Sequence, residues 1–206
     1  MFITLEGPEG SGKTTAVKAA VEKLVALGYE VVQTREPGGT PISEQIRNVI
    51  LDKENTAMDG RTEALLYAAS RRQHLVEKVW PALKEGKIVI CDRYLDSSLA
   101  YQGGARGLGV DNILNINLFA TENTWPDLTL LFDIKPEIGL ARINSNANRE
   151  VNRLDLEKID FHNKVRESFL ALAKRFPNRY VIIDASQDRD TVAKNTLEAI
   201  LARLCK

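Results

Sequence analysis

The sequence predicts an α/β fold, a five-stranded parallel sheet with helices on both faces. Short apolar runs alternate along the chain with longer segments whose apolar residues recur every three or four positions, the order expected of βαβ units. The run at residues 87–92 is apolar along its length, which is typical of a strand buried on both faces of a parallel sheet. We interpret residues 1–206 as a single domain with a small lid at about residues 144–154.

Five apolar runs are the expected strands, each followed by a polar or turn-forming residue. In chain order they cover residues 2–6, 29–34, 87–92, 127–134 and 179–184.

Six segments with helical periodicity are the expected helices. They cover residues 13–27, 43–51, 62–80, 136–143, 161–176 and 191–204. Ser43 is expected to cap the second helix, and Pro81 to bend or interrupt the third. Residues 144–153 break the pattern with four asparagines and no apolar period, and they form either a surface loop or a mobile lid.

The balance of charge excludes one class of partner. The chain has 28 basic and 28 acidic residues. Because a neutral chain lacks the basic surface that wraps DNA or RNA, no nucleic-acid polymer is expected as a partner. No apolar stretch approaches the roughly 20 residues that span a bilayer, so no membrane is expected either.

The cysteines and histidines give no metal site. Cys91 and Cys205 lie far apart in the sequence, and Cys91 belongs to an apolar run that predicts a buried strand residue. Together with an N-terminus that has no secretory signal, this favours a reduced, cytoplasmic protein. His74 and His162 have no second metal ligand at a fixed offset, and both are expected on helix surfaces.

A glycine-rich segment after the first strand predicts nucleotide binding. It fits the pattern G-x-x-x-x-G-K-[ST] and lies between a strand and a helix, as that motif requires. Its backbone N–H groups and the following helix N-terminus attract phosphate, the lysine reaches the β- and γ-phosphates, and the threonine ligates Mg²⁺. The expected ATP-binding residues are Gly7, Pro8, Glu9, Gly10, Ser11, Gly12, Lys13 and Thr14.

A second element of such sites follows the strand of residues 87–92. Asp92 ends that strand, where an acid helps to hold the Mg²⁺ shell in P-loop proteins. Thr14 and Asp92 are therefore the candidate metal ligands, with Mg²⁺ as the expected cofactor and ATP as co-substrate.

Two arginines indicate what the nucleotide is used for. Arg35 and Arg93 both follow predicted strands at the edge of the sheet where ligands bind. Two guanidinium groups there would clamp a second phosphate, the acceptor. A hydrolytic switch uses water as acceptor and needs no such clamp, and the chain has no Asn-Lys-x-Asp guanine-reading motif. The pattern favours a kinase.

Five motifs resemble the bacterial thymidylate kinase family, and they cover essentially the whole chain. In order they are FITLEGPEGSGKTT, TREPGGT, EALLYAASRRQH, CDRYLDSSLAYQG and NRLDLE. The resemblance implies a P-loop kinase fold, the reaction of ATP with dTMP to give ADP and dTDP for dTTP synthesis, and a homodimer. Two alternatives stay open: another deoxynucleoside monophosphate kinase, and a nucleotide-dependent switch that binds a protein partner.

The resemblance also implies how the acceptor phosphate and sugar are bound. Glu9 matches the acid that accepts a hydrogen bond from the 3′-hydroxyl. Arg35 and Arg93 match the arginines on the 5′-phosphate, and Arg47 is a weaker candidate for the same task. Tyr101 matches the ring that fills the space a ribose 2′-hydroxyl would need.

The same resemblance implies a set of residues around the base. Arg71 and Gln102 match residues that read the thymine edge, with Ser98 nearby. Tyr67 stands where the family often has a phenylalanine stacked on the base. Arg142 resembles an arginine near the adenine, although an exposed helix arginine is nearly as plausible.

The catalytic residues implied are Lys13, Arg93, Asp92 and an arginine from the lid. The phosphate loop carries Gly10 and Ser11 where one branch of the family has an arginine. The chain therefore resembles the other branch, in which the lid supplies that charge, and Arg153 and Arg149 are the candidates, with Arg153 favoured.

Overall fold

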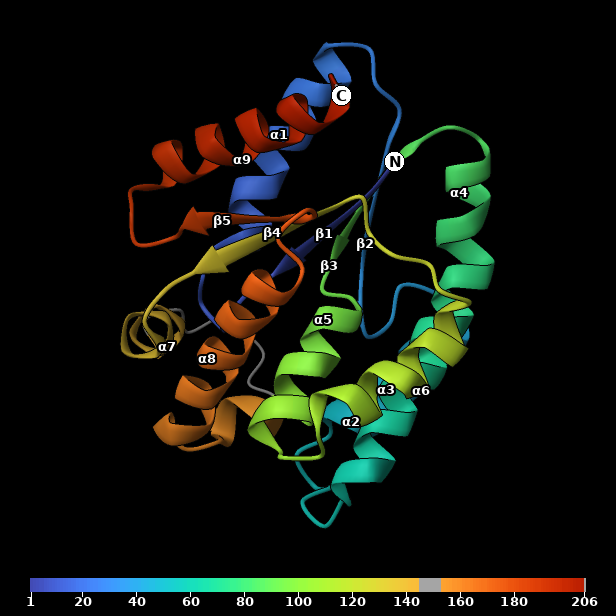
Figure 1. The fold of residues 1–206 in the computed structure, drawn as a ribbon, viewed down its shortest axis with the longest axis vertical. Coiled ribbons are helices and arrows are strands. Elements are labelled where there is room, and N and C mark those ends of the chain that lie inside the picture. Colours follow the sequence, from blue (N-terminus) through green and yellow to red (C-terminus); the bar gives the residue numbers. More distant parts are fainter. Residues whose placement is uncertain (145–152, 206) are drawn as a thin grey trace.

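The computed structural model describes residues 1–144 and 153–205 as a parallel sheet between two layers of helices (Figure 1). Five strands run parallel in the order β2-β3-β1-β4-β5. They are β1 (Phe2–Glu6), β2 (Val31–Arg35), β3 (Ile88–Asp92), β4 (Leu128–Asp133) and β5 (Tyr180–Asp184). The predicted fold class is confirmed, and every expected strand is present within two residues of its predicted ends.

The helices include all six that were expected. They are α1 (Lys13–Ala26), α2 (Pro41–Leu51), α3 (Gly60–His74), α4 (Trp80–Lys84), α5 (Leu95–Ser98), α6 (Val110–Thr121), α7 (Pro136–Asn144), α8 (Ile159–Arg175) and α9 (Arg189–Leu204). Two π-helical turns, η1 (Leu75–Val79) and η2 (Leu99–Ala105), and one 3₁₀ turn, η3 (Arg153–Leu156), complete the set for the described residues. None of these helices is long and apolar enough to cross a membrane.

Two details differ from expectation. Helix α2 begins at Pro41 with Thr40 in the capping position, because proline at the first turn already has the backbone angle of a helix. The Ser43 hydroxyl therefore does not cap α2 but donates a hydrogen bond to the Ser70 carbonyl of α3, at 2.9 Å. Pro81 does not interrupt the helical path: α3 passes into the π turn η1, and α4 begins at Trp80 and continues beyond the proline.

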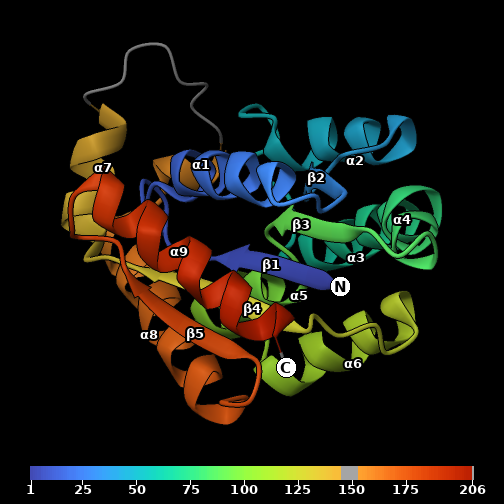
Figure 2. The same ribbon diagram turned by 90° about the horizontal axis from the view of Figure 1, so that it is seen from above.

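The two faces of the sheet have separate apolar cores. Helices α1 and α9 cover one face, and α3, α5, α6 and α8 lie on the other (Figures 1 and 2). Strand β3 is buried along its apolar length, as expected, and Cys91 within it is fully buried. Burial on both sides makes the sheet a rigid platform, from whose edge the functional side chains project.

The carboxyl ends of the three adjacent strands β2, β3 and β1 meet at one edge. Backbone hydrogen bonds continue past the strands there, from Arg93 to the Leu5 carbonyl and from Glu36 to the Asp92 carbonyl, both at 2.9 Å. The segments that follow the three strands are thereby held side by side, and the candidate site lies among them.

Candidate active site

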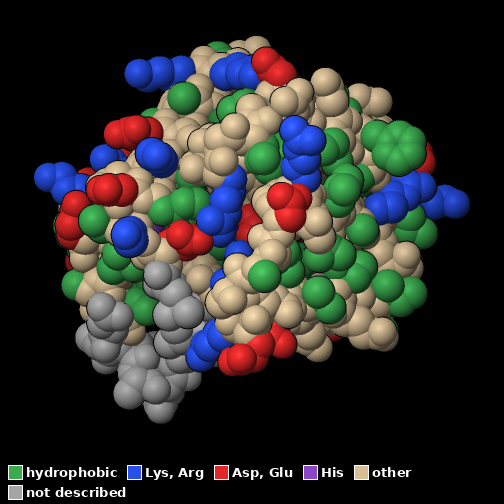
Figure 3. All heavy atoms as spheres, turned by 90° about the horizontal axis from the view of Figure 1, so that it is seen from below, with side chains coloured by type: hydrophobic (Ala, Val, Ile, Leu, Met, Phe, Trp, Pro, Cys, Tyr) green, Lys and Arg blue, Asp and Glu red, His purple; other side chains and the backbone are tan. Residues whose placement is uncertain are grey.

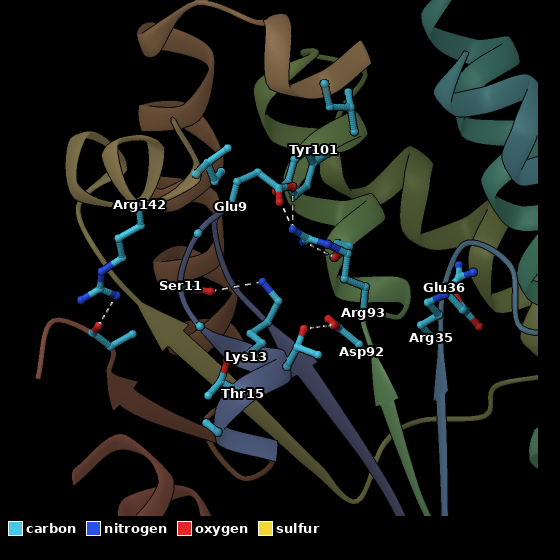
Figure 4. A pocket seen from close by; sticks show the side chains of 18 of the residues that line it. Glu9, Ser11, Lys13, Thr15, Arg35, Glu36, Asp92, Arg93, Tyr101 and Arg142 are labelled. Atoms are coloured by element: carbon cyan, nitrogen blue, oxygen red, sulfur yellow. Dashed lines mark hydrogen bonds and ion pairs between the residues drawn. The ribbon is translucent and has the colours of Figure 1, made fainter. Parts of the chain in front are cut away.

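A cavity of about 870 Å³ lies at the carboxyl edge of the sheet. The glycine loop forms one end, and the segments after β2 and β3, together with α3 and η2, form the other (Figure 4). Basic and acidic side chains gather on the face seen in Figure 3. Sixteen of the predicted site residues line the cavity: Glu9, Gly10, Ser11, Gly12, Lys13, Thr14, Arg35, Arg47, Tyr67, Arg71, Asp92, Arg93, Ser98, Tyr101, Gln102 and Arg142. Gly7 and Pro8 of the predicted loop are not among its lining residues.

The loop between β1 and α1 has the shape that phosphate binding requires. Gly10 has a left-handed φ of 69°, and a Cβ there would lie 2.1 Å from the carbonyl oxygen of Gly139 in α7. Only glycine fits so close an approach. The loop is thus pressed against α7 while its backbone wraps the start of α1.

The Lys13 ammonium lies inside this loop. It donates to the carbonyls of Gly7 and Pro8 and to the Ser11 hydroxyl, each at 3.2 Å (Figure 4). Burial, and then the charge of Arg93, lower the pKa of Lys13 to about 8 against the pull of nearby carboxylates. A polyanion bound in the loop would supply the countercharge that this ammonium needs.

The residues beside Lys13 fit a magnesium ion. The Thr14 hydroxyl donates to Asp92 Oδ2 at 3.4 Å, so a hydroxyl and a carboxylate face each other. Asp92 Oδ1 is buried and has no hydrogen-bond partner among the described residues. A buried carboxylate oxygen costs free energy when unpaired, and a hard cation that prefers oxygen ligands would satisfy it.

Arg93 joins the phosphate side of the cavity to its acceptor side. Its φ of 69° is left-handed, which turns the side chain across the end of β3. The guanidinium donates to Glu9 Oε1 at 2.7 Å, to the Tyr101 hydroxyl at 3.1 Å and to the Ser97 hydroxyl at 3.1 Å. Burial opposes the charge of Arg93, but Glu9 and Tyr101 together raise its pKa well above the ordinary value. Arg93 is a fixed, permanent cation.

Two more arginines converge nearby from different elements. Arg35 at the end of β2 and Arg47 in α2 both donate to the Pro37 carbonyl, at 3.0 Å each. Arg35 also pairs with Glu44 at 2.9 Å and keeps about half of its side chain exposed. Arg35, Arg47 and Arg93 therefore all line the cavity, and whether they bind an acceptor phosphate stays a prediction.

Arg71 is the most completely enclosed cation of the site. It is 2% exposed and donates to Glu36 at 2.7 Å, to the Ser98 hydroxyl at 3.1 Å and to the Asn117 side-chain carbonyl. Glu36 also holds the His74 ring, at 2.9 Å. The guanidinium of Arg71 is thus held against the cavity wall by acceptors on three sides.

Both histidines correct the sequence analysis. His74 and His162 were expected on helix surfaces, yet they are 0% and 2% exposed. His74 is buried because its two ring nitrogens reach Glu36 and Thr34, the latter at 2.6 Å. A helical pattern alone does not reveal such long-range partners.

Helix α3 and the π turn η2 also contribute uncharged side chains to the cavity. Tyr67 and Gln102 are both buried and line the cavity, and the Gln102 amide donates to Glu63 Oε1 at 2.8 Å. Tyr101 is also enclosed, and its ring meets Phe161 and Phe169 edge-on, with centroids 6.2 and 6.1 Å away.

The predicted nucleotide and lid residues lie in different places. Arg142 in α7 lines the cavity and donates to the Ala185 carbonyl at 2.9 Å (Figure 4). Arg153 is bound to Glu63 of α3 and to the Ile50 carbonyl, the latter at 3.2 Å, and is not among the residues that line the cavity. Arg149 lies outside the described residues, as does most of the predicted lid.

The amino-acid sequence is similar to that of known proteins over nearly the whole chain. The family model for thymidylate kinase matches residues 5–196. The chain belongs to the thymidylate kinase family. Across its whole length it is 60% identical to 97% of the thymidylate kinase of Bacillus velezensis. It is 63% identical to that of Clostridium novyi over 93% of each chain. It is 56% identical to that of a Geobacillus species over 98% of this chain and 97% of the relative.

Within the thymidylate kinase framework, four acidic or polar residues escaped the sequence analysis: Glu6, Glu36, Glu63 and Ser97. Glu36 holds Arg71, Glu63 holds Gln102, and Ser97 bridges Arg93 to the buried Glu6, to which it donates at 2.6 Å. Glu6 and Glu36 could have been found, because each is an acid that follows an apolar strand at the ligand-binding edge. Glu63 has no comparable signal, since it lies in the first turn of a helix, where acids are common.

Proposed function

We propose that this protein transfers the γ-phosphoryl group of ATP to dTMP, giving ADP and dTDP for the synthesis of dTTP. The observation that carries the proposal is one cavity with two cationic ends, Lys13 in the glycine loop and the arginine cluster around Arg93. The polyphosphate of the donor would bind at Lys13 and the phosphate of the acceptor at the arginine cluster. The reacting phosphates would then lie next to each other between these two ends of the cavity. The family supports thymidine as the nucleoside.

The chemistry requires little from the protein beyond position and charge. An oxygen of the dTMP phosphate attacks the γ-phosphorus, a new P–O bond forms, and the bond to the β-phosphate oxygen breaks, leaving ADP. The attacking oxygen is already anionic, so no general base is needed. Lys13 and Arg93 would neutralise charge on the transferring oxygens. The ammonium of Lys13 uses its three donors on Gly7, Pro8 and Ser11, so it would exchange at least one of these contacts for a phosphate oxygen.

Mg²⁺ belongs to the proposal as well. The Thr14 hydroxyl and the Asp92 carboxylate would hold it, directly or through water. When bound, it would supply positive charge that offsets the charge of the ATP phosphates. The unpaired Asp92 oxygen is the feature that supports this assignment.

Three further expectations remain proposals. We assign the catalytic lid arginine to Arg149 before Arg153, because the guanidinium of Arg153 is bound to Glu63. A cytoplasmic location is supported by two cysteines that form no disulfide, Cys91 and Cys205. The homodimer that the family resemblance implies is the third of these proposals.

The test is a coupled assay of ADP formation from ATP, with dTMP, dUMP, dCMP and dAMP offered separately. Turnover should be fastest with dTMP and absent without an acceptor, whereas a switch would hydrolyse ATP alone. Lys13→Met should fold normally and lose transfer. Arg149→Ala should lose about 10³-fold or more in kcat while ATP affinity changes much less. Preference for another monophosphate, or acceptor-independent hydrolysis, would refute the proposal.

A further inference from the structure

Glu63 is a buried carboxylate that stands behind the cavity wall. It is 1% exposed, lies in the first turn of α3 and is not among the residues that line the cavity. Its Oε1 accepts from the Gln102 amide at 2.8 Å and from Arg106 Nε at 3.4 Å. Its Oε2 accepts from Arg153, and from Arg106 Nη2 at 3.5 Å. The Glu63 carboxylate thus accepts hydrogen bonds from three separate places in the chain: η2, the residue directly after η2, and η3.

The charge state of Glu63 follows from these contacts. Burial alone would raise the pKa of Glu63, but the hydrogen bonds from Arg153 and Gln102 bring it below the ordinary value. Glu63 is therefore ionised, and an ionised carboxylate only accepts hydrogen bonds.

This acceptor determines which way the Gln102 amide faces. The NH₂ group must point at Glu63, so the amide oxygen points the other way. Gln102 is 2% exposed and lines the cavity, and its oxygen has no hydrogen-bond partner among the described residues. The site therefore offers a bound base an acceptor at this position.

We propose that Glu63 is a positioning residue for base specificity, which holds the Gln102 amide oxygen toward the cavity so that it accepts from the N3–H of thymine. The inference rests on the proposed function, which supplies the thymine. Cytosine has a lone pair at N3 in place of the N–H group. The fixed amide oxygen of Gln102 would repel that lone pair, and neither group would have a hydrogen-bond partner.

Arg71 contributes separately to the same selection. Its guanidinium can only donate, which suits a carbonyl oxygen of the base, and Glu36 holds it independently of Glu63. Loss of Glu63 should thus remove only the share of the selectivity that depends on Gln102.

The experiment compares kcat/KM for dTMP with that for 5-methyl-dCMP, which keeps the methyl group and changes only the N3 and C4 positions. Glu63→Gln replaces an obligate hydrogen-bond acceptor with an amide that can donate or accept. The side-chain amide of Gln102 can then rotate by 180°, which exchanges the positions of its oxygen and its NH₂ group. The ratio of the two kcat/KM values should fall by about tenfold, the worth of one hydrogen bond exchanged for a mismatch. Because both substrates are measured on one preparation, the ratio does not depend on the fraction of active enzyme.

Two further variants separate positioning from structural support. Arg106→Gln removes the longer contacts to Glu63 but keeps its bond to Gln102, and should leave the ratio unchanged. In a Gln102→Ala background, Glu63→Gln should have no further effect on the ratio, because the two residues act through one contact. If Glu63→Gln does not fold, Glu63→Asp retains the charge, withdraws the carboxylate from Gln102 and should also lower the ratio.

The outcomes distinguish this inference from the proposed function. A wild-type enzyme that does not phosphorylate dTMP would overturn the function itself. An active wild type whose folded Glu63 variants keep the wild-type ratio, or lower it equally without Gln102, would overturn the inference alone.

Discussion

Tyr101 is predicted to combine a hydrogen-bonding role with a steric one. Its hydroxyl donates to Glu9 Oε1 at 3.0 Å while it accepts from Arg93 Nη2 at 3.1 Å. The ring is 3% exposed and packs from η2 against the aromatic residues Phe161 and Phe169 of α8. We expect that a ring so confined leaves no room for an additional hydroxyl group on the sugar.

Replacing Tyr101 should therefore relax sugar selection. Tyr101→Ser removes the ring, and kcat/KM for the ribonucleotide analogue of dTMP should rise toward that for dTMP by about tenfold or more, the range of a relieved steric clash. Tyr101→Phe keeps the ring and should keep the selectivity, although it loses the contacts to Glu9 and Arg93. Steady-state kinetics with both nucleotides measures the ratio. Equal selectivity in all three enzymes would assign the exclusion to another residue.

At the scale of elements, the glycine loop is shaped partly by the helix that it touches. Gly139 in α7 has ordinary helical geometry, yet a Cβ there would lie 2.3 Å from the carbonyl oxygen of Glu9. Gly10 makes the reciprocal approach to the Gly139 carbonyl. The loop and α7 therefore meet backbone to backbone, without intervening side chains.

Gly139→Ala should consequently weaken nucleotide binding, although alanine is a better helix former than glycine. Alanine in a helix gains up to about 1 kcal/mol over glycine, but the new methyl group must displace the loop backbone at Glu9. We expect the dissociation constants of both ATP and dTMP to rise, because Glu9 belongs to the predicted ATP-binding loop and is also the predicted partner of the dTMP sugar. Gly60→Ala in α3 is the matched control, since its Cβ would meet Leu108 only at 3.7 Å. Isothermal titration with each nucleotide measures the effect, and identical affinities in both variants would contradict the prediction.

Elements with local signals could be predicted, and those shaped by distant contacts could not. The strands follow from apolar runs, and the glycine loop from its motif. The stretch from α5 through η2 to α6 was missed because Gly103 and Gly104 suggest a turn. In the structure Gly104 allows close packing instead, since a Cβ there would lie 2.0 Å from the Ser168 hydroxyl of α8.

The same division applies within the site. Arg35 and Arg93 could be predicted because they lie at the ends of strands that must meet at one edge. Which arginine pairs with which acid could not be predicted, because Arg71 binds Glu36 at a separation of 35 residues and Arg153 binds Glu63 at a separation of 90. No local pattern encodes such pairs.

At the scale of the whole molecule, three helices leave apolar side chains in solvent. Helix α2 packs on α3 and α3 on α6, and Figure 3 shows hydrophobic side chains gathered at its right, the side on which α3 and α6 lie in Figure 1. Phe119 of α6 is 90% exposed, Leu65 of α3 is 56% exposed and Val49 of α2 is 48% exposed. Apolar groups in such number on adjacent helices are typical of a protein interface.

We propose that this helical face forms the expected homodimer. Sedimentation equilibrium should give twice the 23.0 kDa mass of one chain at micromolar concentration. Phe119→Asp places a charge where a large apolar ring would be buried, and it should weaken the dimer by about 30-fold or more, the effect of losing an interface hot spot. Its folding should be unharmed, because the side chain makes almost no contacts within the chain. Leu27→Asp is the control: Leu27 is 61% exposed at the end of α1, on the opposite face of the sheet, and its replacement should leave the dimer intact. A monomeric wild type, or a Phe119→Asp variant that dimerises as tightly as the parent, would show that this face is free in solution.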